Sequence, residues 1–129
     1  MTPNPPVKGK KILIVEDEEA LSNALRITLE KEGYEVTVAS DGEEGAVRMT
    51  NETFDVALLD LLMPKMGGFT LLETLKEEGK NTTPVMVLSN LGQDEDIEKA
   101  KRLGVKEYLV KANSPINRIV EKVNAIAGK

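Results

Sequence analysis

The most restrictive feature of the sequence is a short apolar run, Val56–Leu59, that ends directly at the acidic residue Asp60. A continuous apolar run of this length is typical of a strand buried on both faces, as in a parallel sheet covered by helices. Pro64 and Gly67 then end the extended segment. The pattern predicts an α/β fold with Asp60 at the carboxyl end of a central strand, which is where open α/β sheets bind their ligands.

Strand and helix patterns alternate along the rest of the chain. Short apolar segments predict strands at 10–15, 35–39, 56–59, 85–88 and 107–110. Helices are predicted at 19–32, after the capping box Asp41-x-x-Glu44, at 69–77, at 94–103 and after Ser114-Pro115. This alternation predicts a doubly wound five-stranded parallel sheet with five helices and right-handed crossovers.

Local signals predict the ends and the buried faces of several helices. Gly33 should end the first helix, because glycine readily adopts the left-handed conformation of a helix end. Ser114 is predicted to cap the last helix, with Pro115 at its first position. In the short helix that follows the capping box, Ala46 and Val47 are expected to face the core.

Composition excludes several classes of chemistry and of partner. The chain contains neither Cys nor His, which excludes disulfides, Cys or His nucleophiles, a conventional zinc site and a Ser-His-Asp triad. A formal net charge of -5 argues against nucleic acid as a partner of this domain. No apolar run approaches the roughly 20 residues that span a membrane, and the N-terminus lacks the apolar core of a signal peptide. We therefore expect a cytoplasmic protein without a membrane partner.

The chain is predicted to form one domain after a short tail. Residues 1–9 hold three of the six prolines and are expected to be a flexible N-terminal tail. Residues 10–129 are enough for one hydrophobic core, and no internal repeat interrupts them.

Four of the five predicted strand ends carry charged or reactive side chains. These are Glu16 with Asp17, Asp60, Ser89 and Lys111. If the first and central strands are neighbours, the three carboxylates converge, and a hard divalent cation such as Mg²⁺ best relieves their repulsion. Lys111 adds a fixed positive charge, and Ser89 adds a hydroxyl donor. A carboxylate surrounded by a cation, an ammonium group and a hydroxyl is suited to carrying a phosphoryl group.

With these motifs, the sequence resembles the receiver domain of bacterial two-component response regulators, of the chemotaxis-regulator type. The resemblance covers residues 11–127. It rests on motifs that appear in family order, namely the pair Glu16-Asp17, the segment Asp60-Leu61-Leu62-Met63-Pro64, Ser89, Tyr108 and Lys111. It implies a flavodoxin-like strand order, 2-1-3-4-5.

The resemblance implies a phosphoacceptor and a metal site. Asp60 would accept a phosphoryl group from a sensor histidine kinase or a phosphotransfer protein, and the chain would catalyse its own phosphorylation and dephosphorylation. Asp17, Asp60 and the main-chain carbonyl of Leu62 would bind Mg²⁺. Glu16 would act mainly through a metal-bound water.

The resemblance further implies a switch. Ser89 and Lys111 would contact the phosphoryl oxygens, and Tyr108 would report the state of Ser89. The face formed by the 94–103 helix, the 107–110 strand and the last helix would then change shape. Partners, or a second copy in a phosphorylation-dependent homodimer, would recognise that face.

Three positions depart from the family pattern. Asn90 stands where Ala or Gly is usual, and its bulk is expected to narrow access to Asp60. Ala112 follows Lys111 where Pro is common, and we expect a trans peptide bond there, because a cis bond before alanine costs roughly 3 to 4 kcal/mol. Gly67 stands where an acidic residue is frequent, which should affect the local turn more than the chemistry.

Three other functions are compatible with parts of this pattern. A haloacid dehalogenase-like phosphatase would use Asp60 as its nucleophile, but it usually carries a second Asp where this chain has Leu62. A flavodoxin-like cofactor module would need a Ser/Thr-rich phosphate loop after a strand, and no strand here ends in one. A pseudo-receiver used only for docking would not need the acidic pair, Ser89 and Lys111.

Overall fold

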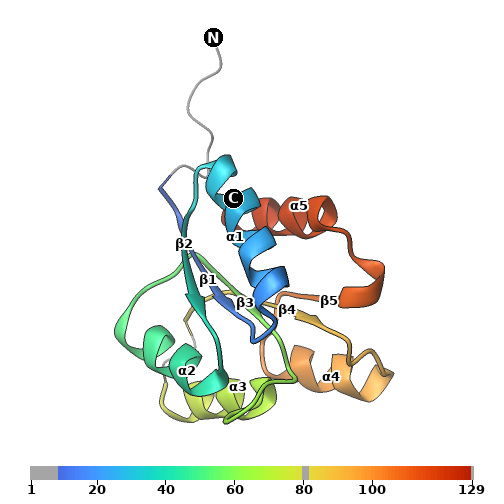
Figure 1. The fold of residues 1–129 in the computed structure, drawn as a ribbon. Coiled ribbons are helices and arrows are strands. Elements are labelled where there is room, and N and C mark those ends of the chain that lie inside the picture. Colours follow the sequence, from blue (N-terminus) through green and yellow to red (C-terminus); the bar gives the residue numbers. More distant parts are fainter. Residues whose placement is uncertain (1–8, 80–81, 129) are drawn as a thin grey trace.

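The chain folds as parallel strands that alternate with helices (Figure 1). The structure is a computed structural model and describes residues 9–79 and 82–128. The expected tail of residues 1–9 lies outside the described residues, except for Gly9.

Every predicted strand and helix is present, and each predicted bound lies within one residue of the observed one. The strands are β1 (Lys11–Val15), β2 (Glu35–Ala39), β3 (Val56–Leu59), β4 (Val85–Ser89) and β5 (Glu107–Val110). The helices are α1 (Glu19–Glu32), α2 (Gly42–Asn51), α3 (Gly68–Glu77), α4 (Asp94–Arg102), the short 3-10 helix η1 (Lys111–Asn113) and α5 (Ile116–Ala127). The strands pair in parallel in the order β2-β1-β3-β4-β5, which confirms the predicted topology.

The sheet separates two hydrophobic cores because successive side chains of a strand point to opposite faces. Ile12 and Ile14 of β1 pack in the core that α1 and α5 cover. Leu13 and Val15 pack in the core that α2, α3 and α4 cover (Figure 1). The central strand β3 is at most 2% exposed along its length. The prediction that Val56–Leu59 is buried on both faces is therefore confirmed.

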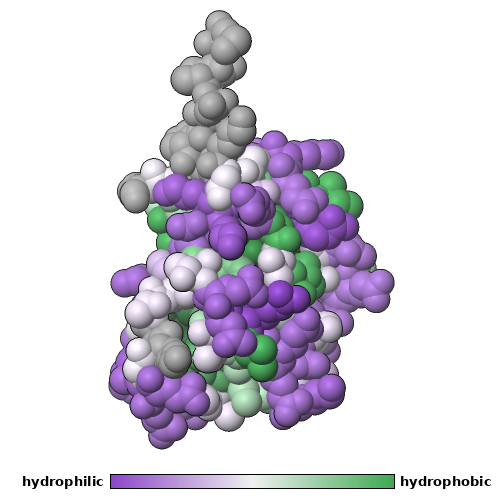
Figure 2. Space-filling view, turned by 90° about the vertical axis from the view of Figure 1, so that its left-hand side faces the viewer, coloured by the Kyte–Doolittle hydropathy of each residue, from purple (hydrophilic) through white to green (hydrophobic). Residues whose placement is uncertain are grey.

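Hydrophilic residues dominate the surface on the side where β2 lies in Figure 1. Hydrophobic residues show there only in small, separate groups (Figure 2). No helix in the ranges 9–79 and 82–128 is long and apolar enough to cross a membrane.

Helix α2 packs through glycines, which corrects one prediction. Val47 is 58% exposed, whereas Gly42, Gly45 and Met49 form the buried face. A side chain at Gly45 would place its Cβ 2.8 Å from Val15 Cγ1, so glycine lets the helix lie close against the sheet. The expectation that Val47 faces the core is wrong, because the face that packs inward runs through Gly42, Gly45 and Met49 instead.

Helix α5 begins differently from its prediction. Pro115 occupies the N-cap position, and the Ser114 hydroxyl donates to the main-chain oxygen of Val110 at 2.8 Å. The prediction of a Ser114 cap is wrong because a carbonyl at the end of β5 binds the same hydroxyl. The apolar side chains of α5 face the core, with Ile119 and Val123 both buried.

Replacing Met49 with Ala should lower the free energy of unfolding by about 2 to 5 kcal/mol, because the substitution leaves a cavity under α2. Val47→Ala on the same helix should change it by less than about 0.5 kcal/mol. Urea denaturation of both variants measures the difference. Equal losses would mean that the buried face of α2 has been misassigned.

Candidate functional site

The parallel register brings the predicted site residues to one edge of the sheet. Val15 pairs with Leu59, so Glu16 and Asp60 follow at the same level on neighbouring strands. Main-chain hydrogen bonds continue past the strand ends, from Asp60 N to Val15 O at 3.1 Å and from Glu16 N to Ala39 O at 3.0 Å. Both acidic residues therefore begin from rigid backbone.

Three carboxyl groups converge at this edge. Oxygen atoms of Glu16, Asp17 and Asp60 lie within 4.8 Å of one another. Glu16 and Asp60 are only 3% and 4% exposed, whereas Asp17 is exposed to solvent. The predicted convergence is observed, and the cluster is open to solvent on the side of Asp17.

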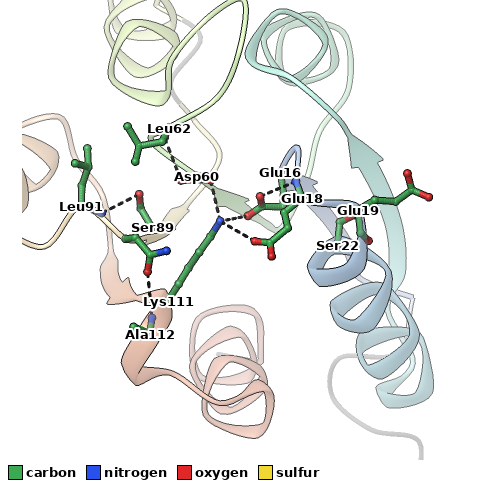
Figure 3. A network of polar contacts seen from close by, with 11 residues as sticks. Glu16, Glu18, Glu19, Ser22, Asp60, Leu62, Ser89, Leu91, Lys111 and Ala112 are labelled. Carbon is green, nitrogen blue, oxygen red and sulfur yellow. Dashed lines mark hydrogen bonds and ion pairs between the residues drawn. The ribbon is translucent and has the colours of Figure 1, made fainter.

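Lys111 lies among the carboxyl groups (Figure 3). Its Nζ is 2.9 Å from Asp60 Oδ2, 2.8 Å from Glu16 Oε1 and 3.6 Å from Glu18 Oε1. Burial alone would lower the pKa of Lys111, but the hydrogen bonds to Glu16 and Asp60 outweigh it and raise the pKa above its ordinary value. The ammonium group therefore stays charged at neutral pH.

Burial has the opposite consequence for Glu16. Desolvation of its carboxyl group raises the pKa of Glu16 above the ordinary value of 4.5, and the nearby Asp60 acts in the same direction. The ammonium of Lys111 and the main-chain N–H of Glu18, which donates to Glu16 Oε2 at 2.9 Å, offset part of this effect. The protein environment therefore disfavours the ionised form of Glu16, compared with the same carboxyl group in water.

The loop between β3 and α3 turns tightly around Asp60. The main-chain N–H of Leu62 donates to Asp60 Oδ1 at 3.0 Å, while the Leu62 side chain is 53% exposed. Gly68 passes so close that a Cβ there would lie 2.7 Å from the main-chain oxygen of Asp60. Both carboxyl oxygens of Asp60 are therefore held, one by Leu62 and the other by Lys111.

Ser89 and Tyr108 meet at one residue of the loop after β4. Ser89 is fully buried, and its Oγ accepts a hydrogen bond from Leu91 N at 3.3 Å. The Tyr108 hydroxyl donates to the main-chain oxygen of Leu91. Burial, with the charges of Asp96 and Asp60, raises the pKa of Tyr108 to about 12, so the hydroxyl keeps its proton. The two residues are linked through a single peptide segment.

Two contacts were not anticipated from the sequence. Glu18, which follows the acidic pair, was given no role, but its carboxyl group faces the Lys111 ammonium. Asn90 was expected to narrow the site, yet its Oδ1 accepts a hydrogen bond from Ala112 N at 3.2 Å. The peptide bond before Ala112 is trans, as predicted. In both cases the sequence showed a polar residue next to a motif position, Glu18 after Asp17 and Asn90 after Ser89. Spacing alone does not predict which partner such a side chain binds.

The residues present fit a hard divalent cation. One ammonium group faces three carboxyl groups, and every candidate ligand atom in the cluster is an oxygen, as Mg²⁺ prefers. The arrangement joins the buried carboxyl group of Asp60 to the positive charge of Lys111 and places the Ser89 hydroxyl at the end of the adjacent strand. These are the elements needed to hold a phosphoryl group on Asp60.

The stability of a Glu16→Gln variant relative to the wild type should increase as the pH rises above 4.5. Because the pKa of Glu16 is raised in the folded state, the folded wild type binds its proton more tightly than the unfolded chain does. The wild type therefore loses stability as the pH rises through the folded pKa, and Gln removes that loss. Urea unfolding with a chelator, over a pH series that brackets 4.5, measures the trend. Glu19→Gln, at an exposed position, is the control, and a pH-independent difference for Glu16→Gln would contradict the assignment.

Comparisons with known proteins agree with this geometry. A family model described as the response regulator receiver domain matches residues 12–124. The chain is 38% identical over 120 residues to "Regulator of RpoS" of Escherichia coli K12, which covers 93% of this chain and 35% of that protein. It is 36% identical over 120 residues to the alkaline phosphatase synthesis transcriptional regulatory protein PhoP of Bacillus subtilis, covering 92% and 48%. The chain thus spans less than half the length of either relative.

A solved structure gives the same result. The receiver domain of the Francisella response regulator 1452 superposes with a TM-score of 0.85 at 30% identity, covering 92% of this chain and 97% of that one. The sheet order, the family match over 12–124 and these relatives lead to one conclusion. The chain belongs to the response regulator receiver domain family of two-component systems.

Proposed function

We propose that Asp60 accepts a phosphoryl group from a sensor histidine kinase or a phosphotransfer protein. The single observation that carries this proposal is the environment of Asp60, a buried carboxylate at the end of the central strand. Lys111 Nζ binds one of its oxygens at 2.9 Å, and Leu62 N–H binds the other at 3.0 Å. In the transfer, an oxygen of Asp60 bonds to phosphorus as the bond from phosphorus to the donor nitrogen breaks.

Two further residues are placed to serve the transferred group. Lys111 already lies beside Asp60, so its ammonium can stay in place and neutralise charge on the phosphoryl oxygens. Ser89 lies at the end of the adjacent strand, and its hydroxyl oxygen accepts from Leu91 while its proton is available for donation. The same groups would assist the later attack of water, so the chain catalyses its own phosphorylation and dephosphorylation.

Receiver domains bind Mg²⁺ in an acidic active site, and this chain has the corresponding cluster. We assign Asp17, Asp60 and the main-chain carbonyl of Leu62 as the groups that would hold the ion, with Glu16 acting through a water. Bound there, Mg²⁺ would supply positive charge that offsets the carboxylates and the incoming phosphoryl group. The exposed side of Asp17 offers a route of entry from solvent.

Asp60→Asn should abolish phosphoryl transfer from acetyl phosphate, because the nucleophile is lost while the strand keeps its apolar packing. The mass of the intact protein, measured with and without Mg²⁺, should show one added phosphoryl group on the wild type only when Mg²⁺ is present. Asp55→Asn, at the opposite end of β3, should be labelled like the wild type.

Three results would count against the proposal. Equal labelling of the wild type and Asp60→Asn would place the acceptor elsewhere. An unlabelled wild type would favour a domain used only for docking. Continuous release of phosphate without a labelled protein would favour a small-molecule phosphatase.

Phosphorylation would act as a switch on the face formed by α4, β5 and α5. A phosphoryl group adds a charge of about -1.5 to -2, enough to draw the Ser89 hydroxyl toward it. That motion would weaken the bond from Leu91 N, and Leu91 O also holds the Tyr108 hydroxyl. A partner protein, or a second copy in a homodimer, would read the altered face. We place this switch in the cytoplasm, with neither nucleic acid nor membrane bound by the domain.

Beryllofluoride with Mg²⁺, which mimics the phosphoryl group, should shift the NMR signals of Ser89, Tyr108 and residues of α5. The physical reason is the shared attachment of Ser89 and Tyr108 to Leu91. The Asp60→Asn variant should show none of these shifts. If the shifts stay confined to the neighbours of Asp60, the phosphoryl site is not coupled to the α4, β5 and α5 face.

A further inference from the structure

We propose that Asn90 is a positioning residue, which fixes the backbone that carries Lys111 through a hydrogen bond to Ala112. This inference rests on the proposed role of Asp60 and Lys111 in phosphoryl transfer. Its basis is a hydrogen bond between the loop after β4 and the short helix η1, from Ala112 N to Asn90 Oδ1 at 3.2 Å.

The hydrogen bond joins the two chain segments just beyond the last residue pair of β4 and β5. The main-chain ladder between β4 and β5 ends at Ser89 and Val110. Asn90 follows β4, and Lys111 follows β5. The Asn90 side chain extends past Lys111 to the main-chain N–H of Ala112. The loop after β4 also passes close to the last residue of β5, because a Cβ on Gly92 would lie 3.1 Å from Val110 Cγ2. Asn90 thus adds a directed bond where this loop already lies close to the end of β5.

The bond holds one specific peptide unit. The plane between Lys111 and Ala112 has one N–H and one carbonyl group, and both are engaged. The N–H donates to Asn90, and the carbonyl of Lys111 accepts from Ser114 N at 3.2 Å. Fixing both groups of a rigid plane fixes the backbone torsions on either side, including that of Lys111. The Lys111 side chain therefore extends toward Asp60 from a fixed backbone position.

The two unusual residues at this position depend on each other. Proline, common at the place of Ala112 in the family pattern, has no N–H to donate. Alanine has the N–H that proline lacks, but no ring fixes its backbone torsion φ. Asn90 accepts a hydrogen bond from this N–H and so restrains the backbone there. The amide oxygen of Asn90 is therefore turned toward Ala112, and its contribution is to hold Lys111 rather than to obstruct Asp60.

Two substitutions separate anchoring from obstruction. Asn90→Leu keeps a side chain of similar size and removes the acceptor, whereas Asn90→Ala removes both. If Asn90 anchors the loop, both variants should lower the maximal rate of phosphorylation by acetyl phosphate about twofold to tenfold, as expected for one hydrogen bond. The donor concentration at half-maximal rate should stay unchanged, because only the alignment of Lys111 is altered. If Asn90 obstructs the site, Asn90→Ala should be faster than the wild type.

Amide hydrogen exchange at Ala112, measured by NMR without any phosphodonor, tests the anchor itself. Exchange should be about twofold to tenfold faster in Asn90→Leu and Asn90→Ala. It should stay close to wild type in Asn90→Asp, which keeps an acceptor oxygen, and in Asn113→Ala, an exposed asparagine of the same loop. The amide signals of the β-sheet confirm that each variant is folded.

Each outcome decides one of the claims. Unchanged exchange at Ala112 in both Asn90→Leu and Asn90→Ala overturns the anchor. Faster exchange with unchanged or increased phosphorylation rates overturns the positioning role. A wild-type protein that accepts no phosphoryl group overturns the proposed function, and the positioning role with it. The exchange measurement still decides whether Asn90 holds the backbone at Ala112.

Discussion

The Lys111 ammonium among the carboxyl groups of Glu16 and Asp60 is the interaction on which the site depends. Two buried carboxylates on adjacent strands would repel each other strongly without it, and removing one partner from a buried ion pair typically costs about 3 to 5 kcal/mol. The sheet determines where these groups meet, since β1, β3 and β5 all end at the same edge. Fold and site are thus joined through one charged side chain that spans from β5 to the centre of the sheet.

The sequence was sufficient to predict the strands and helices because its signals are local and agree with one another. The run Val56–Leu59, the glycine after α1 and the capping box at Asp41 each specify an element without reference to the rest of the chain. Strand order was not readable from periodicity and came from the resemblance. Val47 and Ser114 were misplaced for different reasons. Helix α2 lies against the sheet through Gly45, which no apolar side chain marks, and the Ser114 hydroxyl donates to the main-chain oxygen of Val110 instead of capping α5.

The candidate site was predictable in its members but not in its connections. Glu16, Asp17, Asp60 and Lys111 follow apolar strands, so parallel topology places them at one edge of the sheet, and the strand order implied by the resemblance brings them together. The direction in which the Asn90 side chain points could not be predicted, because it depends on the main-chain N–H of Ala112, which lies beyond a different strand. A side chain that bonds to the backbone of a distant segment leaves little trace in a pattern of residue types.

The attachment of Ser89 and Tyr108 to Leu91 has a consequence for how such a domain can vary during evolution. Both bonds use the main chain of Leu91, through its N–H and its carbonyl oxygen. The link therefore makes no demand on the side chain at that position, and any residue with a free N–H could preserve it. Only proline would remove the N–H. A connection between the strand end at Ser89 and the Tyr108 side chain could persist through extensive sequence change at the residue that joins them.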